Sequence, residues 1–119
     1  MSNGRHLILD LYDCDPEILN DYEGLEQIML AGLSLSKANV LRIIGEHFKP
    51  QGVTLLALLA ESHCSIHTWP EIGYCAIDLY TCGDKTKTHK AAEFLKHKLK
   101  AKISEEKELV RSTTPSVCV

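Results

Sequence analysis

Long apolar runs are missing from this sequence. The longest nearly apolar stretch, Val53–Ala60, is much shorter than the roughly 18–20 residues that a membrane-spanning helix needs. The first six residues, Met1–His6, lead into an acidic apolar stretch and do not resemble the hydrophobic region and cleavage site of a signal peptide. We therefore expect no membrane segment and no export, which makes the cytoplasm the expected location.

An excess of basic charge is also missing. The chain has 13 Lys+Arg against 16 Asp+Glu, a formal net charge of −3, whereas a dedicated nucleic-acid-binding protein is usually basic. The lysines between Lys85 and Lys102 are therefore interpreted as a solvated helix face. With 119 residues, of which 45% are hydrophobic, the chain is too apolar for disorder and has the size of one folded domain. We expect a single domain over residues 1–119.

No Cys-x-x-Cys spacing occurs, and the count of cysteines is odd, at five. An odd number in a reducing compartment does not indicate a disulfide framework, and the spacing argues against a zinc ribbon. Free cysteines are most often small buried apolar residues. That interpretation is the starting point for each of them: Cys14, Cys64, Cys75, Cys82 and Cys118.

Hydrophobic periodicity predicts strands and two helical regions, with no repeat or linker. Alternating residues predict strands over 6–13, 39–48, 53–60, 62–68, 74–81 and 102–111. Asp15-Pro16-Glu17 is a helix-start signal, an apolar stripe predicts a helix over 22–36, and a lysine-rich amphipathic helix is expected over 88–99. Short links between strands favour an α/β (α+β) two-layer sandwich with a mainly antiparallel sheet and helices on one face. Strand 53–60 is apolar on both faces, so we expect a second subunit to cover the other face.

Chemically active side chains gather in residues 61–71, which hold hydroxyls, two histidines, a thiol and two carboxylates. His63, His67, Cys64 and Cys82 supply four potential zinc ligands. However, adjacent residues of a strand point to opposite faces, so His63 and Cys64 cannot easily share a metal ion. A serine hydrolase is equally disfavoured, because no Gly-x-Ser-x-Gly elbow surrounds either serine. We expect no metal ligands in this segment.

The run Glu61–Gly83, which begins Glu-Ser-His-Cys-Ser-Ile-His-Thr-Trp-Pro-Glu and contains Thr81-Cys82-Gly83, resembles the bacterial and archaeal S-adenosylmethionine decarboxylase proenzymes. The resemblance extends to Gly4-Arg5-His6 and to the Phe48–Gly52 segment. It implies a small pyruvoyl-dependent enzyme that cuts itself between Glu61 and Ser62. The products would be a β chain of residues 1–61 and an α chain of residues 62–119, which remain one fold.

The resemblance also implies roles for the residues around the cut. Ser62 becomes the pyruvoyl group, which forms a Schiff base with S-adenosylmethionine; His67 is the base of the self-cleavage, and Cys82 is the proton donor in decarboxylation. Thr54, where the family usually has Ser, assists the acyl shift. If residues 69–73 reverse the chain, residues 62 and 82 lie nearly opposite each other, which supports the role of Cys82 independently.

The same resemblance assigns the substrate contacts and the assembly. Phe48 matches the aromatic residue that stacks on adenine, and Glu71 matches the carboxylate that binds the ribose hydroxyls. The family's active site lies at a homodimer interface. His63 belongs to the signature, and a structural hydrogen-bonding role is its default interpretation. Strict alternation places Ser62 and His67 on opposite faces of their strand, so we expect a bend or bulge between them.

Two alternatives remain open at this point. Related pyruvoyl enzymes decarboxylate arginine or ornithine, and the retained Phe48 and Glu71 favour a nucleoside substrate over these. The second alternative is an unprocessed paralogue that only binds a ligand or regulates a partner. The intact Ser62, His67 and Cys82 argue against it. The leading interpretation is a decarboxylase that supplies the aminopropyl donor for spermidine and other polyamines.

Overall fold

Three leucines that alternate along the first strand fix the inner face of the sheet. Leu7, Leu9 and Leu11 are completely buried in β1 (Gly4–Tyr12). The computed structural model describes residues 4–60, 62–82, 85–112 and 115; Glu61, Gly83, Cys118 and most of the C-terminal tail, which the sequence analysis discusses, lie outside these residues. Five further strands complete the sheet: β2 (Val40–His47), β3 (Val53–Leu59), β4 (Ser62–Trp69), β5 (Tyr74–Thr81) and β6 (Ile103–Arg111).

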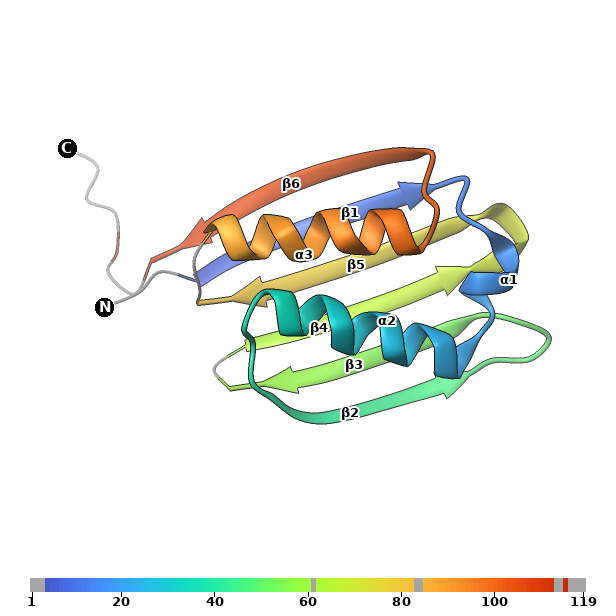
Figure 1. Cartoon of the computed structure of the whole chain (residues 1–119), viewed down its shortest axis with the longest axis horizontal. Coiled ribbons are helices and arrows are strands. Elements are labelled where there is room, and N and C mark those ends of the chain that lie inside the picture. The colour runs from blue at the N-terminus through green and yellow to red at the C-terminus, as the bar shows by residue number, and fades with distance from the viewer. Residues whose placement is uncertain (1–3, 61, 83–84, 113–114, 116–119) are drawn as a thin grey trace.

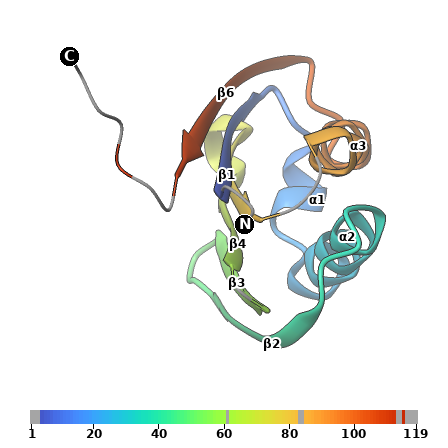
Figure 2. The same ribbon diagram turned by 90° about the vertical axis from the view of Figure 1, so that its left-hand side faces the viewer.

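The sheet is antiparallel throughout, in the order β2-β3-β4-β5-β1-β6 (Figure 1). Consecutive strands β2 to β5 form a meander, and β1 then inserts between β5 and β6. Helices α1 (Pro16–Leu19), α2 (Tyr22–Leu35) and α3 (Lys85–Lys98) lie on one side of the sheet (Figure 2). A single 3-10 turn, η1 (Pro70–Ile72), joins β4 to β5. The predicted α+β arrangement, with helices on one face of an antiparallel sheet, is confirmed.

The first helical region is divided in two, which the sequence pattern did not predict. Asp15 caps α1 by accepting a hydrogen bond from the Glu17 amide at 2.9 Å, and Asp21 caps α2 by accepting one from the Gly24 amide at 3.0 Å. Each aspartate starts its own helix, because a side-chain oxygen that satisfies a free N–H group favours a helix N-terminus. Helix α3 also begins earlier than predicted, at Lys85 instead of Thr88. Within the described residues, no helix has both the length and the apolar character that a membrane crossing requires.

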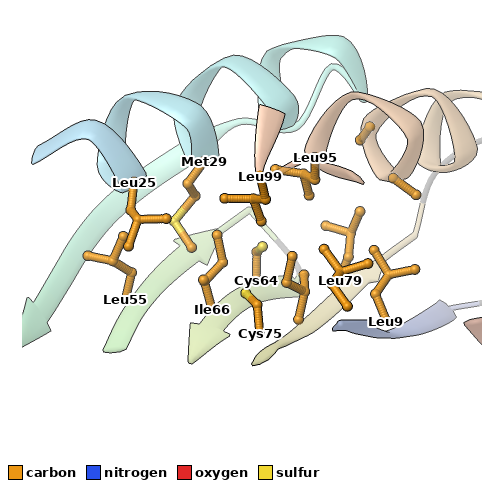
Figure 3. Packing of buried hydrophobic residues seen from close by; sticks show 14 of the residues in the cluster. Leu9, Leu25, Met29, Leu55, Cys64, Ile66, Cys75, Leu79, Leu95 and Leu99 are labelled. Atoms are coloured by element: carbon orange, nitrogen blue, oxygen red, sulfur yellow. The ribbon is translucent and has the colours of Figure 1, made fainter. Parts of the chain in front are cut away.

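The core lies between the helices and the inner face of the sheet. Leu25 and Met29 of α2 and Leu95 of α3 point toward the strands (Figure 3) and are at most 2% exposed. The amphipathic helix predicted over 88–99 turns its apolar positions to the core, and all four are buried: Ala91, Ala92, Leu95 and Leu99. Cys14, Cys64 and Cys75 belong to the same cluster, which confirms that they are buried apolar residues. Burial raises the pKa of the Cys14 thiol to about 11 and that of Cys64 to about 12, so both remain protonated near neutral pH.

The opposite face of the sheet has no helical cover and carries exposed apolar side chains. Ile44 of β2 is 59% exposed, and Leu56 and Leu58 of β3 are 43% and 52% exposed. Regular alternation over the predicted strand 39–48 would place Leu41 on the same face as Ile43, and this expectation is wrong, because the pairing with β3 is irregular between Val40 and Arg42. This β-bulge shifts the alternation, and Leu41 is 58% exposed.

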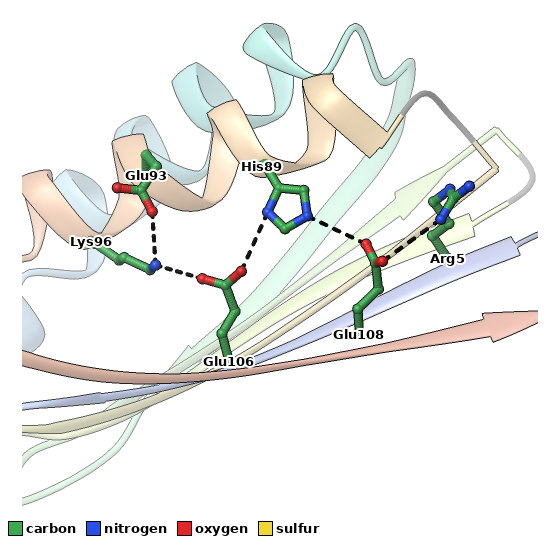
Figure 4. Close-up of polar contacts among 6 residues, drawn as sticks. All are labelled: Arg5, His89, Glu93, Lys96, Glu106 and Glu108. Atoms are coloured by element: carbon green, nitrogen blue, oxygen red, sulfur yellow. Dashed lines mark hydrogen bonds and ion pairs between the residues drawn. The ribbon is translucent and has the colours of Figure 1, made fainter.

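Charged side chains, in place of apolar ones, join the edge strand β6 to α3. Figure 4 shows the chain of contacts: Lys96 reaches Glu106, His89 lies between Glu106 and Glu108, and Arg5 lies 3.7 Å from Glu108. Burial alone would lower the pKa of Lys96, but hydrogen bonds to Glu106 and Glu93 raise it. These contacts pair the helix-facing carboxylates Glu106 and Glu108 of β6 with lysine, histidine and arginine side chains.

Gly45 provides a test of the packing between β2 and its neighbours. A Cβ at this position would lie 2.5 Å from Cδ2 of Leu55 and 2.7 Å from the backbone oxygen of Thr54. Because a backbone atom cannot move aside without disturbing the ladder, Gly45→Ala should lower the free energy of unfolding by about 1–3 kcal/mol in urea denaturation. Leu41→Ala on the same strand is the matched control and should change it by less than about 0.5 kcal/mol. Equal denaturation midpoints for the two variants would contradict this packing argument.

Candidate active site

Ser62 and His67 lie on the same strand but on opposite faces of the sheet. Pairing of β4 with β3 is uninterrupted from Thr54 opposite His67 to Leu59 opposite Ser62, so the bulge expected between Ser62 and His67 is absent from this stretch. Alternation therefore holds: Ser62 shares the helix-covered face with Cys64, and His67 lies on the open face. Along the strand the two residues are about 16 Å apart, at roughly 3.3 Å per residue. They do not meet within one chain.

Ser62 and Cys82 line one cavity, of about 260 Å³. The reversal at residues 70–73 pairs β4 with β5 so that His63 lies opposite Tyr80, which sets Ser62 almost opposite Cys82. The expectation that these two residues lie close together across the hairpin is thus confirmed. We call this space the Ser62 cavity. Its remaining lining consists of Ser36, Lys37, Ala38, Asn39, Ala60 and Thr81.

The turn Ser36–Asn39, which joins α2 to β2, is a wall of the Ser62 cavity that the sequence analysis missed. It closes α2 through hydrogen bonds from the Lys37 amide to Ser34 and from the Ala38 amide to Leu33, each 3.1 Å. Lys37 adopts a positive φ of 57°, a conformation that usually favours glycine at this position after a helix. Because a lysine rarely adopts a positive φ, the sequence contained no sign that the chain turns at Lys37.

Thr54 and His67 meet in a second cavity, of about 350 Å³, which we call the His67 cavity. Thr54 Oγ1 lies 3.1 Å from His67 Nδ1, within hydrogen-bond distance. A hydroxyl and an imidazole in contact can pass a proton between them, which is the requirement for general acid–base chemistry. Phe48 and Glu71 line the same cavity, so the structure brings all four of these predicted residues together. The rest of the lining is Gln51, Gly52, Thr68 and Trp69.

His63 lies in neither cavity but on the open face of the sheet. Its ring is 5.6 Å from the ring of Tyr80 and 6.3 Å from that of His6, measured between centroids. His6 Nε2 in turn lies 2.9 Å from Oδ1 of Asp78. His63 also lines an apolar hollow of about 380 Å³ with Leu56 and Leu58. His63 therefore belongs to the uncovered surface of the sheet, where its ring packs against neighbouring rings.

Metal binding finds no support from the geometry of the described chain. Within residues 4–60, 62–82 and 85–112, no three His, Cys, Asp or Glu side chains come close enough together to hold a metal ion. His63 points from the open face, whereas Cys64 is buried against the helices. The two neighbours therefore cannot share a ligand sphere, as strand alternation predicted.

Comparisons with known proteins agree with the sequence motif. Residues 5–112 match a family model described as S-adenosylmethionine decarboxylase. The S-adenosylmethionine decarboxylase proenzyme of Prochlorococcus marinus (strain MIT 9313) is 50% identical over 110 residues, which cover 92% of this chain and 88% of that protein. The corresponding proenzyme of Clostridium tetani is 44% identical over 99 residues, covering 83% of this chain and 79% of that protein.

A solved structure is similar over the whole fold. The adenosylmethionine decarboxylase from Aquifex aeolicus VF5 superposes with a TM-score of 0.88 and 29% sequence identity, covering 99% of this chain and 98% of that one. The resemblance drawn from the run Glu61–Gly83 is therefore confirmed at the level of both sequence and fold.

The contact between Thr54 and His67 predicts how two substitutions should differ. Thr54→Val keeps the shape of the side chain but removes its hydroxyl, whereas Thr54→Ser keeps the hydroxyl and removes the methyl group. If the hydroxyl assists chain cleavage, Thr54→Val should slow the cleavage by about 10²-fold or more, and Thr54→Ser should not slow it. Electrophoresis of the full-length chain over time measures both rates. Cleavage of Thr54→Val at the unsubstituted rate would exclude Thr54 from the reaction.

Proposed function

Because the chain belongs to the S-adenosylmethionine decarboxylase family, we propose that it is a self-processing, pyruvoyl-dependent enzyme that decarboxylates S-adenosylmethionine in the cytoplasm. The product would be the aminopropyl donor for spermidine and other polyamines. The observation that carries the proposal is the meeting of Ser62 and Cys82 in one cavity, at the point where the family motif has its cleavage site. A half-buried serine beside a thiol suits both reactions that the motif implies.

Self-cleavage begins with the Ser62 hydroxyl, which attacks the carbonyl carbon of Glu61. The bond from that carbon to the Ser62 nitrogen breaks, and an ester replaces the peptide. His67 then removes the proton from Cα of Ser62; the bond between Cβ and the ester oxygen breaks, which releases the Glu61 carboxylate. The remaining dehydroalanine takes up water and loses ammonia to become a pyruvoyl group at position 62. Neutral imidazole is suited to the proton transfer near neutral pH.

The residues around Ser62 fit such a group. Ser62 lies at the first position of β4 and lines a cavity of about 260 Å³, which leaves room beside it for a substrate. A pyruvoyl group supplies an electron-withdrawing carbonyl that, once condensed with a substrate amine, takes up the electron pair left when carbon dioxide departs. Cys82 would donate the proton from Sγ to the substrate carbon that has lost the carboxylate. Phe48 and Glu71, in the His67 cavity, would bind the base and the ribose.

The two fragments would stay together because they alternate in the sheet. Residues 1–61 contribute β1, β2 and β3, and residues 62–119 contribute β4, β5 and β6. In the strand order β2-β3-β4-β5-β1-β6, three ladders join one fragment to the other: β3–β4, β5–β1 and β1–β6. Cleavage at the link between β3 and β4 therefore breaks no ladder, and both pieces remain in one core.

The separation of the two cavities supports a homodimer. Ser62 and Cys82 lie at one end of β4, and Thr54 and His67 lie near its other end. A reaction that needs Ser62 and His67 together therefore requires a second copy of the chain. The open sheet face offers the surface for it, because Ile44 and Leu58 are 59% and 52% exposed. We propose that the two open sheet faces pack against each other, so that the end of β4 that carries Ser62 in one copy lies over the His67 cavity of the other.

Release of carbon dioxide from the processed protein tests the activity. S-adenosylmethionine, arginine and ornithine are compared as substrates, and only S-adenosylmethionine should react. Cys82→Ala should still be cleaved but should release carbon dioxide at least about 100-fold more slowly, since it lacks the proton donor. Ser62→Ala should remain a single chain by mass spectrometry. Undiminished turnover by Cys82→Ala would exclude that thiol, and turnover of arginine or ornithine alone would contradict the proposed substrate.

Mixing two inactive chains tests the shared site. Ser62→Ala lacks the attacking hydroxyl and His67→Ala lacks the base, so each alone should remain uncleaved. When the two are co-expressed with different tags, a mixed dimer contains one site with Ser62 from one copy and His67 from the other. Only the His67→Ala chain should then be cleaved, and mass spectrometry identifies it by its tag. If neither chain is cleaved in isolated mixed dimers, the two residues do not act across the interface.

A further inference from the structure

An imidazole and a carboxylate form a close pair in the open face of the sheet. His6, the last residue of the Gly4-Arg5-His6 segment, lies on the opposite face of β1 from the buried Leu7, and its Nε2 is 2.9 Å from Oδ1 of Asp78 on β5. Ser65 Oγ on β4 lies 3.5 Å from Oδ2 of the same carboxylate. The side chains of His6 and Asp78 are 25% and 35% exposed. Neither residue takes part in the proposed reaction.

The ring of Tyr80 holds this pair in position. The His6 ring lies 5.7 Å and the His63 ring 5.6 Å from the Tyr80 ring, measured between centroids. The Arg111 guanidinium lies over the same ring, 5.7 Å from its centroid. A Cβ at Gly4 would lie 2.6 Å from Cε1 of Tyr80, so the glycine leaves the ring its space. The position of the His6 imidazole is therefore set by packing on Tyr80 as well as by its carboxylate partner.

Ser65 and Asp78 mark the centre of the open face. They are direct partners in the ladder between β4 and β5, which are the two middle strands of the six. Along β4, Ser65 is also the open-face residue nearest to the midpoint between Ser62 and His67. The proposed dimer brings those two residues together from different copies, so the level of Ser65 has a special place in it.

Symmetry then determines which residues meet. Two identical faces that pack against each other are related by a two-fold axis that lies between them. To bring the Ser62 end of β4 over the His67 end of the other copy's β4, this axis must cross the strand halfway between the two residues, at the level of Ser65. Residues on the axis face their own copies. Asp78, the ladder partner of Ser65, would therefore face the partner's Asp78.

Two carboxylates at this place would oppose the assembly. Face-to-face sheets pack about 10 Å apart, so the two Asp78 side chains would come close with little water between them, and like charges in that position weaken an interface. As an imidazolium, His6 would cancel the charge of each. Lys107 stands two strands from Asp78, opposite Ile8 on β1, and Asp10 already accepts a hydrogen bond from the Tyr74 hydroxyl. The imidazole at 2.9 Å is thus the group placed to balance Asp78.

We propose that Asp78 lies at the two-fold axis of the homodimer and that His6, as an imidazolium, is a positioning residue that neutralises it there. This inference rests on the proposed function and adds a requirement to it. Without the neutralisation the two faces would repel each other, and the Ser62 end of one copy would not reach His67 of the other. His6 touches no reacting atom and acts only through assembly of the shared site.

Cross-linking tests the position of the axis. Leu56 of β3 pairs with Ser65 and so lies at the axis level, whereas Leu58 pairs with His63, two residues farther along the same face. Leu56→Cys should join to its own copy with a short bifunctional maleimide. Leu58→Cys is the matched control and should not, because its two copies lie roughly 13 Å farther apart along the strands. Denaturing electrophoresis would show a covalent pair of residues 1–61, whose other thiol, Cys14, is buried.

Charge variants test the neutralisation. His6→Gln keeps a hydrogen-bond donor but loses the charge, so it should raise the Kd of the dimer by about tenfold or more and slow chain cleavage at concentrations near that Kd. Asp78→Asn alone should leave Kd near that of the unsubstituted protein, and the double variant should recover both assembly and cleavage. Analytical ultracentrifugation measures Kd, and mass spectrometry measures cleavage. His97→Gln, at an exposed histidine of α3 on the helical side of the sheet, is the matched control and should change neither.

The outcomes separate this inference from the proposed function. If the contact between His6 and Asp78 only stabilised the fold, Asp78→Asn would weaken the dimer as His6→Gln does and the double variant would not recover, which would overturn the role of His6. Equal cross-linking of Leu56→Cys and Leu58→Cys in a dimeric, active protein would overturn the position of the axis and leave the activity intact. A dimer that cross-links through Leu56→Cys but is never cleaved would support the axis and contradict self-processing.

Discussion

The regular pairing of β4 between β3 and β5 is the constraint on which the rest of the structure depends. Because this ladder runs without interruption from Ser62 to His67, every second side chain points to the helices and the others point to the open face. The ladder therefore separates the serine from the histidine and creates two cavities at opposite ends of one strand. It also joins the residues on either side of the proposed cleavage site, so that a cut chain would keep its sheet.

One-sided helical cover has a functional consequence as well as a structural one. Helices α2 and α3 lie over the inner face of the sheet (Figure 2). The outer face keeps large apolar side chains in contact with solvent. Contiguous exposed apolar surface of this kind is typical of an interface. Under the proposed function, the same surface that needs a cover also carries His67, so assembly and completion of the active site would be one event.

A row of stacked aromatic residues leads from β1 to the His67 cavity. The row of Tyr12, Tyr74 and Trp69 crosses three strands and ends next to His67, whose ring lies 6.4 Å from the indole. Rings that are stacked and hydrogen-bonded lose little further freedom when a ligand binds, which favours affinity. The loop of Phe48 is fixed differently: the Phe48 amide donates a hydrogen bond to the Gly52 oxygen, and the Gly52 amide donates one to Oδ1 of Asn20. Both sides of the His67 cavity are therefore held by contacts within the chain.

Local sequence determined the strands, their faces outside the bulged start of β2, and the closeness of Ser62 to Cys82, because alternation and a short reversal at Trp69–Gly73 act over few residues. It also determined the family, through an uninterrupted motif. Tertiary structure alone decided the rest. The bulge expected between Ser62 and His67 was wrong, since it assumed that one chain must bring them together. Insertion of β1 between β5 and β6, the wall formed by Ser36–Asn39 and the meeting of Phe48 with His67 in one cavity all depend on contacts between segments distant in sequence, which no local pattern encodes.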